Sequence, residues 1–313
     1  MSEKKEYMTK TPVVALLALV CCLLWGSAFS GVKTGYEKFG IESSDWQSQM
    51  VFAGVRFAIA GIMVIIFGSF TEKKVLLPTK ESLPKIAVIS FFQTIAQYFF
   101  YYIGLAHTTG VKAAIIVAAN VFFAILFSSL IFKMEKLTPL KILGSVVGFA
   151  GIIVINWGGI SGGLSFNFLG DGFIFLCTVA SGFSSVFMKK YSANENPVML
   201  SGWQFFFGGA VMCIFGFICG GKMTGFTLSS TSILLYLSFV SAAAYSLWAT
   251  LLKYNPVSKV SVFGFMNPIC GVIISSIVLG ESSSFGLQGL AALVLVCVGI
   301  CVVNSDKSSE NTK

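Results

Sequence analysis

Long stretches without a charged residue constrain this chain more than any other feature. Charge-free stretches cover residues 12–32, 86–106, 113–132, 142–170, 172–188, 196–221, 223–252, 260–280 and 282–305, and stretch 49–71 holds one charge, Arg56. A helix needs about 20 apolar residues to cross the roughly 30 Å hydrocarbon core of a bilayer. Because most of these stretches reach that length, they predict an all-α polytopic membrane protein.

The composition excludes a soluble enzyme or a soluble nucleic-acid binder. Hydrophobic residues make up 56% of the chain and charged residues only 11%, against roughly 25% charged residues in soluble domains. The chain has eight cysteines, mostly inside apolar stretches, and a single histidine. We therefore expect no metal site and no cofactor, and we interpret the cysteines as small apolar side chains within helices.

Ten membrane-spanning helices fit the pattern. The expected spans are 12–32, 49–70, 86–106, 112–132, 140–157, 169–188, 198–220, 231–252, 259–280 and 284–304. With the N-terminus in the cytoplasm, 16 lysines fall on the inner side and 4 on the outer side, as the positive-inside rule requires. The protein is thus expected in the cytoplasmic membrane, with both termini in the cytoplasm. The net charge of +8 then reflects topology, so we expect a lipid bilayer and no nucleic acid as partner.

The two halves of the chain resemble each other. A shift of 147 residues aligns several polar and aromatic positions, and a shift of 146 aligns two glutamates. The aligned pairs are Tyr98 and Tyr245, Tyr101 and Trp248, Lys112 and Lys259, Asn120 and Asn267, and Glu135 and Glu281. We call residues 1–157 the first copy and residues 164–305 the second copy, followed by a polar tail, 306–313.

Each copy has five expected spans, so the second copy must enter the membrane from the opposite side. This is an inverted repeat, with a pseudo-two-fold axis in the membrane plane. Two related copies can exchange conformations and so open a central site to one side and then to the other. The arrangement predicts a secondary transporter for a small-molecule substrate, and it leaves a homodimer open.

Several short motifs resemble those of the EamA-type drug/metabolite transporter superfamily. They are Trp25-Gly-Ser-Ala-Phe29, Arg56-Phe-Ala58, Glu135-Lys-Leu-Thr-Pro139 with Gly144 and Gly151, Asn267-Pro268, and Leu279-Gly-Glu281. The resemblance covers both copies. It implies ten helices and export or exchange of amino acids or other small metabolites. The sequence departs from the family pattern at Val121, at Lys133-Met134 and after Glu281, which affects inferences about gating only.

Arg56 is the most unusual residue within a span. A charge there costs on the order of 3 kcal/mol, so Arg56 needs a partner or an aqueous cavity. It could bind the carboxylate or phosphate of a substrate, or it could bond to helix carbonyls. In the repeat alignment the position of Arg56 corresponds to Trp203 and Gln204 in the second copy. We include both among the expected substrate-binding residues.

A row of polar and aromatic residues follows in the third span. Gln93, Gln97 and Tyr101 recur at a spacing of four, which places them on one helix face. We expect this face to line a substrate cavity, although interhelical contacts or an interfacial aromatic belt would also explain it. The remaining expected cavity residues are Tyr98, Tyr245 and Trp248.

A second set of residues suggests gating or structural roles. Trp25 and Ser27 lie among small residues, which favours close helix packing. Pro268 frees a backbone carbonyl, so Asn120 and Asn267-Pro268 suggest a hinge or a polar cavity wall. Glu135 and Glu281 lie at the ends of their spans, and we interpret them as making helix-end contacts with neighbouring backbone or a lysine.

The sequence thus predicts a transporter that moves a small polar metabolite, foremost an amino acid for export, by alternating access. Efflux of cationic or lipophilic compounds, such as quaternary amines, is an alternative that would use the aromatic residues. A non-transporting membrane scaffold is a third. An enzyme is not expected, because the spans lack clustered catalytic groups. No acidic residue lies deep in a span, so the coupling ion stays open.

Overall fold

The computed structural model describes residues 2–42, 44–108, 110–157, 166–279 and 287–306, and these residues form helices and connecting loops without a strand. The first copy contains α1 (Ser2–Thr9), α2 (Thr11–Phe39), α3 (Trp46–Glu72), α4 (Leu83–Ile89), η1 (Ser90–Ala96), α5 (Gln97–Leu105), α6 (Gly110–Ala118), α7 (Asn120–Leu126), η2 (Phe127–Ile131) and α8 (Pro139–Ile155). The second copy contains η4 (Phe168–Gly172), α9 (Phe173–Ser192), α10 (Pro197–Ile218), α11 (Leu228–Tyr254), α12 (Val257–Ser261), η5 (Val262–Phe265), α13 (Met266–Leu279) and α14 (Leu287–Asn304).

Each of the ten expected spans has a helical counterpart. Eight helices of the described chain are long and apolar enough to cross a membrane. The fifth and tenth spans correspond to shorter apolar helices, Pro139–Ile155 and Gly289–Asn304. The chain is therefore a helical membrane protein with at least these eight candidate spans.

Local sequence signals set the helix ends. The Asn196 side chain accepts hydrogen bonds from the first backbone N–H groups of α10, and Pro197 occupies the first turn, as expected at an N-terminus. Thr227 and Ser230 cap α11 reciprocally. At its C-terminus, α2 ends before Gly40. The φ of 65° at Gly40 is the left-handed conformation that glycine adopts readily.

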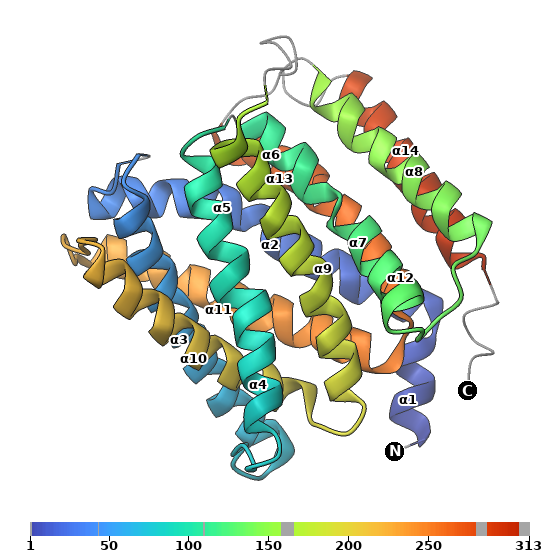
Figure 1. The fold of residues 1–313 in the computed structure, drawn as a ribbon, viewed down its shortest axis with the longest axis horizontal. Coiled ribbons are helices and arrows are strands. Elements are labelled where there is room, and N and C mark those ends of the chain that lie inside the picture. The colour runs from blue at the N-terminus through green and yellow to red at the C-terminus, as the bar shows by residue number, and fades with distance from the viewer. Residues whose placement is uncertain (1, 43, 109, 158–165, 280–286, 307–313) are drawn as a thin grey trace.

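Two pairs of helices from the first and second copies lie side by side. In Figure 1, α3 packs along α10 and α8 packs along α14. Glycines allow the backbones to touch: a Cβ on Gly54 would lie 2.5 Å from the Cys213 backbone nitrogen. A Cβ on Gly299 would lie 2.5 Å from the Gly144 carbonyl oxygen. Small residues at these crossings replace the large interdigitating side chains of soluble helix pairs.

The fourth and ninth spans are both interrupted at equivalent points. In the fourth span, α6 ends at Ala118 and α7 begins at Asn120. In the ninth span, the 3₁₀ segment Val262–Phe265 precedes α13. Asn120 is thus the first residue of α7, and Asn267 is the second residue of α13. Broken helices of this kind occur in membrane proteins where the backbone is buried in protein or lines a cavity.

Candidate functional site

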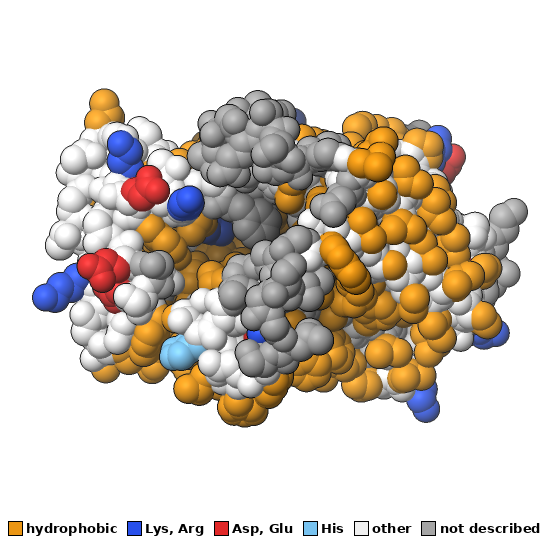
Figure 2. Space-filling model, turned by 90° about the horizontal axis from the view of Figure 1, so that it is seen from above, with side chains coloured by type: hydrophobic (Ala, Val, Ile, Leu, Met, Phe, Trp, Pro, Cys, Tyr) orange, Lys and Arg blue, Asp and Glu red, His pale blue; other side chains and the backbone are white. Residues whose placement is uncertain are grey.

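A large cavity lies between helices of both copies. It has a volume of about 860 Å³ and is lined from α2, α3, η1, α5, α6, α7, α9, α11 and α13, among other segments. The exposed side chain of Lys33 and the end of α5 at Leu105 belong to the lining. Figure 2 looks onto one end of the molecule, and this face is hollowed near its middle, with hydrophobic side chains deep inside.

Most of the residues expected at the site line this cavity. These are Trp25, Arg56, Gln93, Gln97, Tyr98, Tyr101, Asn120, Tyr245, Trp248, Asn267 and Pro268. The face of Gln93, Gln97 and Tyr101 persists although the helix becomes π-helical over Ser90–Ala96. Single-turn π segments inside α-helices are frequent at functional sites.

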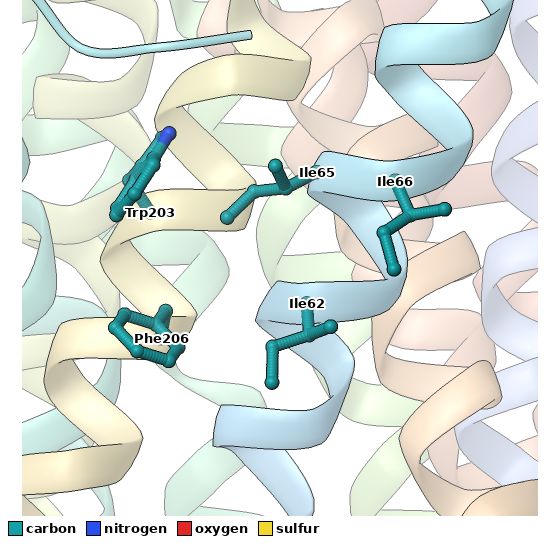
Figure 3. A pocket seen from close by; sticks show the side chains of 5 residues that line it. All are labelled: Ile62, Ile65, Ile66, Trp203 and Phe206. Carbon is teal, nitrogen blue, oxygen red and sulfur yellow. The ribbon is translucent and has the colours of Figure 1, made fainter. Parts of the chain in front are cut away.

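Trp203 and Gln204 lie elsewhere. Trp203 lines a small apolar groove of about 170 Å³ together with Ile62, Ile65, Ile66 and Phe206, between α3 and α10 (Figure 3). Its indole Nε1 donates to the Leu76 carbonyl at 2.7 Å. Gln204 is fully buried, and its side-chain oxygen accepts from Thr94 at 2.7 Å. The sequence alignment with Arg56 predicts how deep Trp203 and Gln204 lie in the membrane. It does not predict the direction in which their side chains point.

Ser27 also lies outside the cavity lining. Its hydroxyl donates to the Leu24 carbonyl at 2.7 Å and accepts from the Tyr236 hydroxyl at 2.7 Å. These contacts join α2 to α11. Glu281 lies outside the described residues.

Arg56 is buried beside the cavity with an unusual set of partners. Its side chain lies on α3 and is only 6% exposed. Nε and Nη2 donate to the Ser241 hydroxyl at 3.2 and 3.1 Å. The guanidinium carbon lies 4.7 Å from the centre of the Phe57 ring, a cation–π distance. No Asp or Glu of the described ranges forms an ion pair with it.

The Phe57 ring next to the guanidinium belongs to a larger aromatic cluster. Phe57 stacks on Phe205 at 5.2 Å, and four partly buried tyrosines pack against the cluster around these rings: Tyr36, Tyr98, Tyr101 and Tyr245. The Tyr98 and Tyr245 hydroxyls are hydrogen-bonded at 2.9 Å. Trp25 meets Tyr245 and Trp248 edge-to-face at 5.0 and 5.1 Å. These rings form an amphipathic wall that can contact apolar groups and still offer hydroxyl groups.

Several buried polar atoms near the cavity have no partner within the described chain. They are the indole nitrogen of Trp25, the side-chain oxygens of Gln93 and Asn267, and the Ser261 hydroxyl. All four residues line the cavity. An unpaired buried polar atom is costly, and in this conformation each of these four atoms is shielded from the cavity space by its neighbours.

A second polar cluster lies near the end of the molecule that carries α1 and α12, at the lower right of Figure 1. We call Ser128, Glu135, Lys141 and Ser258 the Glu135 cluster. Glu135 accepts from Ser128 at 2.6 Å, from Lys141 at 2.7 Å and from the Ser258 backbone N–H at 3.0 Å. The Ser258 hydroxyl also donates to it. Lys141 is fully buried. The ion pair between Glu135 and Lys141 belongs to the first copy, and through Glu135 it contacts Ser258 of the second copy. Ser258 lies three residues before Ser261, which lines the cavity.

Further hydrogen bonds hold the end of α11 and the residues that follow it. Lys189 donates to the Lys253 carbonyl at 3.0 Å, and Lys253 donates to the Glu195 carbonyl at 2.9 Å. Asn255 donates to the Met8 carbonyl of α1 at 2.9 Å. The α11–α12 connection is thus bonded to three other parts of the chain.

Sequence reasoning missed several of these residues for identifiable reasons. Lys33 and Tyr36 line the cavity, but the first span was expected to end at 32. In the structure α2 continues to Phe39, and the signal was Gly40, a helix-ending residue. Ser241 and Ser258 carried no signal, because their importance depends on partners 185 and 123 residues away.

The fold and this polar, aromatic cavity define a membrane transport protein, and comparison with known proteins specifies the family. The model of the EamA-like transporter family matches residues 13–157 and again residues 168–305. The chain belongs to this family and is a transporter, not an enzyme.

Relatives support the same assignment. An uncharacterized transporter of Bacillus subtilis, YvbV, is 26% identical over 308 residues, covering 97% of this chain and 95% of its own. The uncharacterized inner membrane transporter YedA of Escherichia coli is 28% identical over 322 residues, with coverage of 95% and 96%. A protein of Salmonella typhimurium named "Probable amino-acid metabolite efflux pump" is 23% identical over 308 residues, with coverage of 91% and 93%. A solved crystal structure shares the fold with a TM-score of 0.75 and 18% identity, covering 93% of this chain and 96% of that one.

Proposed function

We propose that this transporter moves a small metabolite that carries a carboxylate, foremost an amino acid, out of the cell across the cytoplasmic membrane. The observation that carries the proposal is Arg56, a buried guanidinium at the cavity whose described partners are a serine and a phenylalanine ring. A buried charge needs compensation. A substrate carboxylate would supply it through a bidentate hydrogen bond.

The charge of the cavity favours this substrate over a cationic compound. Among the described residues that line it, Lys33 and Arg56 carry the only formal charges, and both are positive. A quaternary amine would meet repulsion from Arg56 at close range. The ammonium group of an amino acid is tolerated better, because neutral polar residues of the lining, such as Gln97 and Tyr98, can accept its hydrogen bonds. The aromatic wall suits an apolar side chain.

We further propose that the chain forms ten membrane-spanning helices as an inverted repeat with both termini in the cytoplasm. The family model matches twice along the chain, which supports two copies. The bond between Tyr98 and Tyr245 supports a pseudo-two-fold axis, because equivalent residues touch one another only near the axis that relates them. The pairing of α3 with α10 and of α8 with α14 agrees with this symmetry.

In this arrangement the cavity opens to the outside, and the Glu135 cluster closes the cytoplasmic end. Lys141 belongs to the same copy as Glu135, whereas Ser258 belongs to the other copy. Opening toward the cytoplasm would therefore break the contacts of Glu135 with Ser258 and leave its pair with Lys141 intact. The helix breaks before Asn120 and Asn267 supply points at which the fourth and ninth spans can bend.

The test is transport by the purified protein in liposomes. Labelled amino acids are compared with labelled tetraethylammonium under imposed proton and sodium gradients, for wild type and for Arg56→Ala. We expect saturable amino-acid transport that Arg56→Ala reduces at least tenfold, as for the loss of a charged hydrogen bond worth about 1.5–3 kcal/mol. Transport of tetraethylammonium in place of amino acids, or equal rates for wild type and Arg56→Ala, would refute the proposed substrate.

A further inference from the structure

A neutral residue, Ser241, holds the guanidinium of Arg56. Ser241 lies on α11, in the second copy, and Arg56 lies on α3, in the first. Ser241 is fully buried. Its hydroxyl oxygen accepts from Nε at 3.2 Å and from Nη2 at 3.1 Å. One edge of the guanidinium is thus fixed by the opposite copy.

The proton of that hydroxyl is already committed. Ser241 donates to the Leu237 carbonyl of its own helix at 3.1 Å. A hydroxyl has one proton and two lone pairs, so both lone pairs remain for Arg56. Ser241 therefore acts toward Arg56 only as an acceptor, with its oxygen in a set direction.

The two buried cations of the described part of the chain, Arg56 and Lys141, have different partners. Lys141 is paired with a carboxylate, Glu135, at 2.7 Å. The hydrogen-bond acceptor of Arg56 is instead the hydroxyl of a serine, Ser241. A carboxylate would hold the guanidinium more strongly, but it would also neutralise it. A serine fixes the group and leaves its positive charge available.

We propose that Ser241 is the positioning residue of the substrate site, an inference that rests on the proposed function of Arg56. By occupying Nε–H and one Nη2–H, Ser241 leaves the two Nη1 protons and the second Nη2 proton. These form the planar fork that binds a carboxylate through two parallel bonds. The Phe57 ring at 4.7 Å restricts the tilt of that fork.

The experiment measures L-leucine counterflow in liposomes, with L-leucinamide as a competitor that lacks the carboxylate. Ser241→Ala is compared with Ser238→Ala, a matched control on the same helix. Ser238 is also fully buried, and its hydroxyl bonds to the Leu234 carbonyl at 2.8 Å. Ser241→Thr keeps the hydroxyl, and Ser241→Asp places a carboxylate against Arg56.

We expect Ser241→Ala to raise the half-saturating concentration of L-leucine about tenfold, as for the loss of a charged hydrogen bond, with little change in maximal rate. Inhibition by L-leucinamide should stay within twofold of wild type. Ser241→Thr should restore L-leucine affinity, and Ser238→Ala should behave as wild type. Ser241→Asp should abolish L-leucine counterflow while the protein still elutes as a folded species.

The outcomes separate the two proposals. If Arg56→Ala equals wild type, or if wild type shows no saturable L-leucine counterflow, the proposed function fails. If Arg56→Ala loses counterflow but Ser241→Ala matches Ser238→Ala, only the role of Ser241 fails. Should Ser241→Ala not fold, Ser241→Asp decides, because retained L-leucine affinity in that variant overturns the need for an unneutralised charge.

Discussion

The buried pair of Lys141 and Glu135 should respond differently to single and double substitution. Their side chains are 0% and 2% exposed, with 2.7 Å between Nζ and Oε2. Lys141→Met leaves the Glu135 carboxylate buried with only neutral donors from Ser128 and Ser258. Breaking a buried pair in this way costs about 3–5 kcal/mol, whereas replacing both partners by apolar residues is often close to neutral. We expect the double variant Glu135→Leu/Lys141→Met to recover most of the lost stability.

Transport should not recover with it. The double variant lacks the acceptor for the backbone N–H and the hydroxyl of Ser258. A hydrogen bond to a charged group contributes about 1.5–3 kcal/mol, so losing even one shifts the balance between closed and open cytoplasmic ends at least tenfold. The protein should then spend more time open toward the cytoplasm, although most of its stability has been recovered.

Two measurements check this prediction. Unfolding in sodium dodecyl sulfate, followed by circular dichroism, compares the stability of the single variant, the double variant and wild type. Labelling of a cysteine at Ser261 by an impermeant maleimide, in a cysteine-free background and from the cytoplasmic face, reports opening. The reasoning is refuted if the double variant is as unstable as Lys141→Met, or if it restores both stability and wild-type labelling.

Three further substitutions test other parts of the structure. Gly54→Leu should prevent α3 from packing on α10, because a Cβ there would lie 2.5 Å from the Cys213 nitrogen; an unchanged elution profile and unfolding midpoint would contradict that close approach. Asn255→Ala removes the bond to the Met8 carbonyl, so limited proteolysis within α1 should quicken; equal cleavage rates would show that α1 does not depend on this bond. Arg56→Lys keeps the charge but loses the planar fork, so the half-saturating concentration of L-leucine should rise about tenfold; equal affinity would mean that charge alone suffices.

The helices could be located from the sequence because the membrane leaves few alternatives. Backbone polar groups in lipid must bond internally, so each long uncharged stretch had to be a helix. The error at the end of α2 has the same origin. Lys33 and Lys38 suggested a loop after residue 32, but a helix continues through charged residues once it leaves the apolar region, and here it ends only at Gly40.

The site could be predicted only in part. Unusual polar residues such as Gln93 and Gln97 stand out in an apolar stretch, and both line the cavity. The direction of a side chain depends on how each helix is rotated against its neighbours, and the sequence register does not contain that rotation. For this reason the sequence did not predict that Trp203 faces the groove between α3 and α10. Ser241 is one of many serines, and its significance comes only from its distance to Arg56.

Two charged residues of the first copy, Arg56 and Lys141, have no charged counterpart in the second copy, and this has a kinetic consequence. Arg56 is matched by Trp203 and Gln204 in the repeat, and Leu287 stands six residues after Glu281 where Lys141 follows Glu135. In the proposed inverted repeat, this difference gives the outward-facing and inward-facing forms unequal free energies. A solute should half-saturate the carrier at different concentrations on the two faces. If no ion is coupled to transport, the maximal rates in the two directions must differ in the same ratio as the two half-saturating concentrations. The reason is that a passive carrier cannot build a gradient, even when its two copies differ.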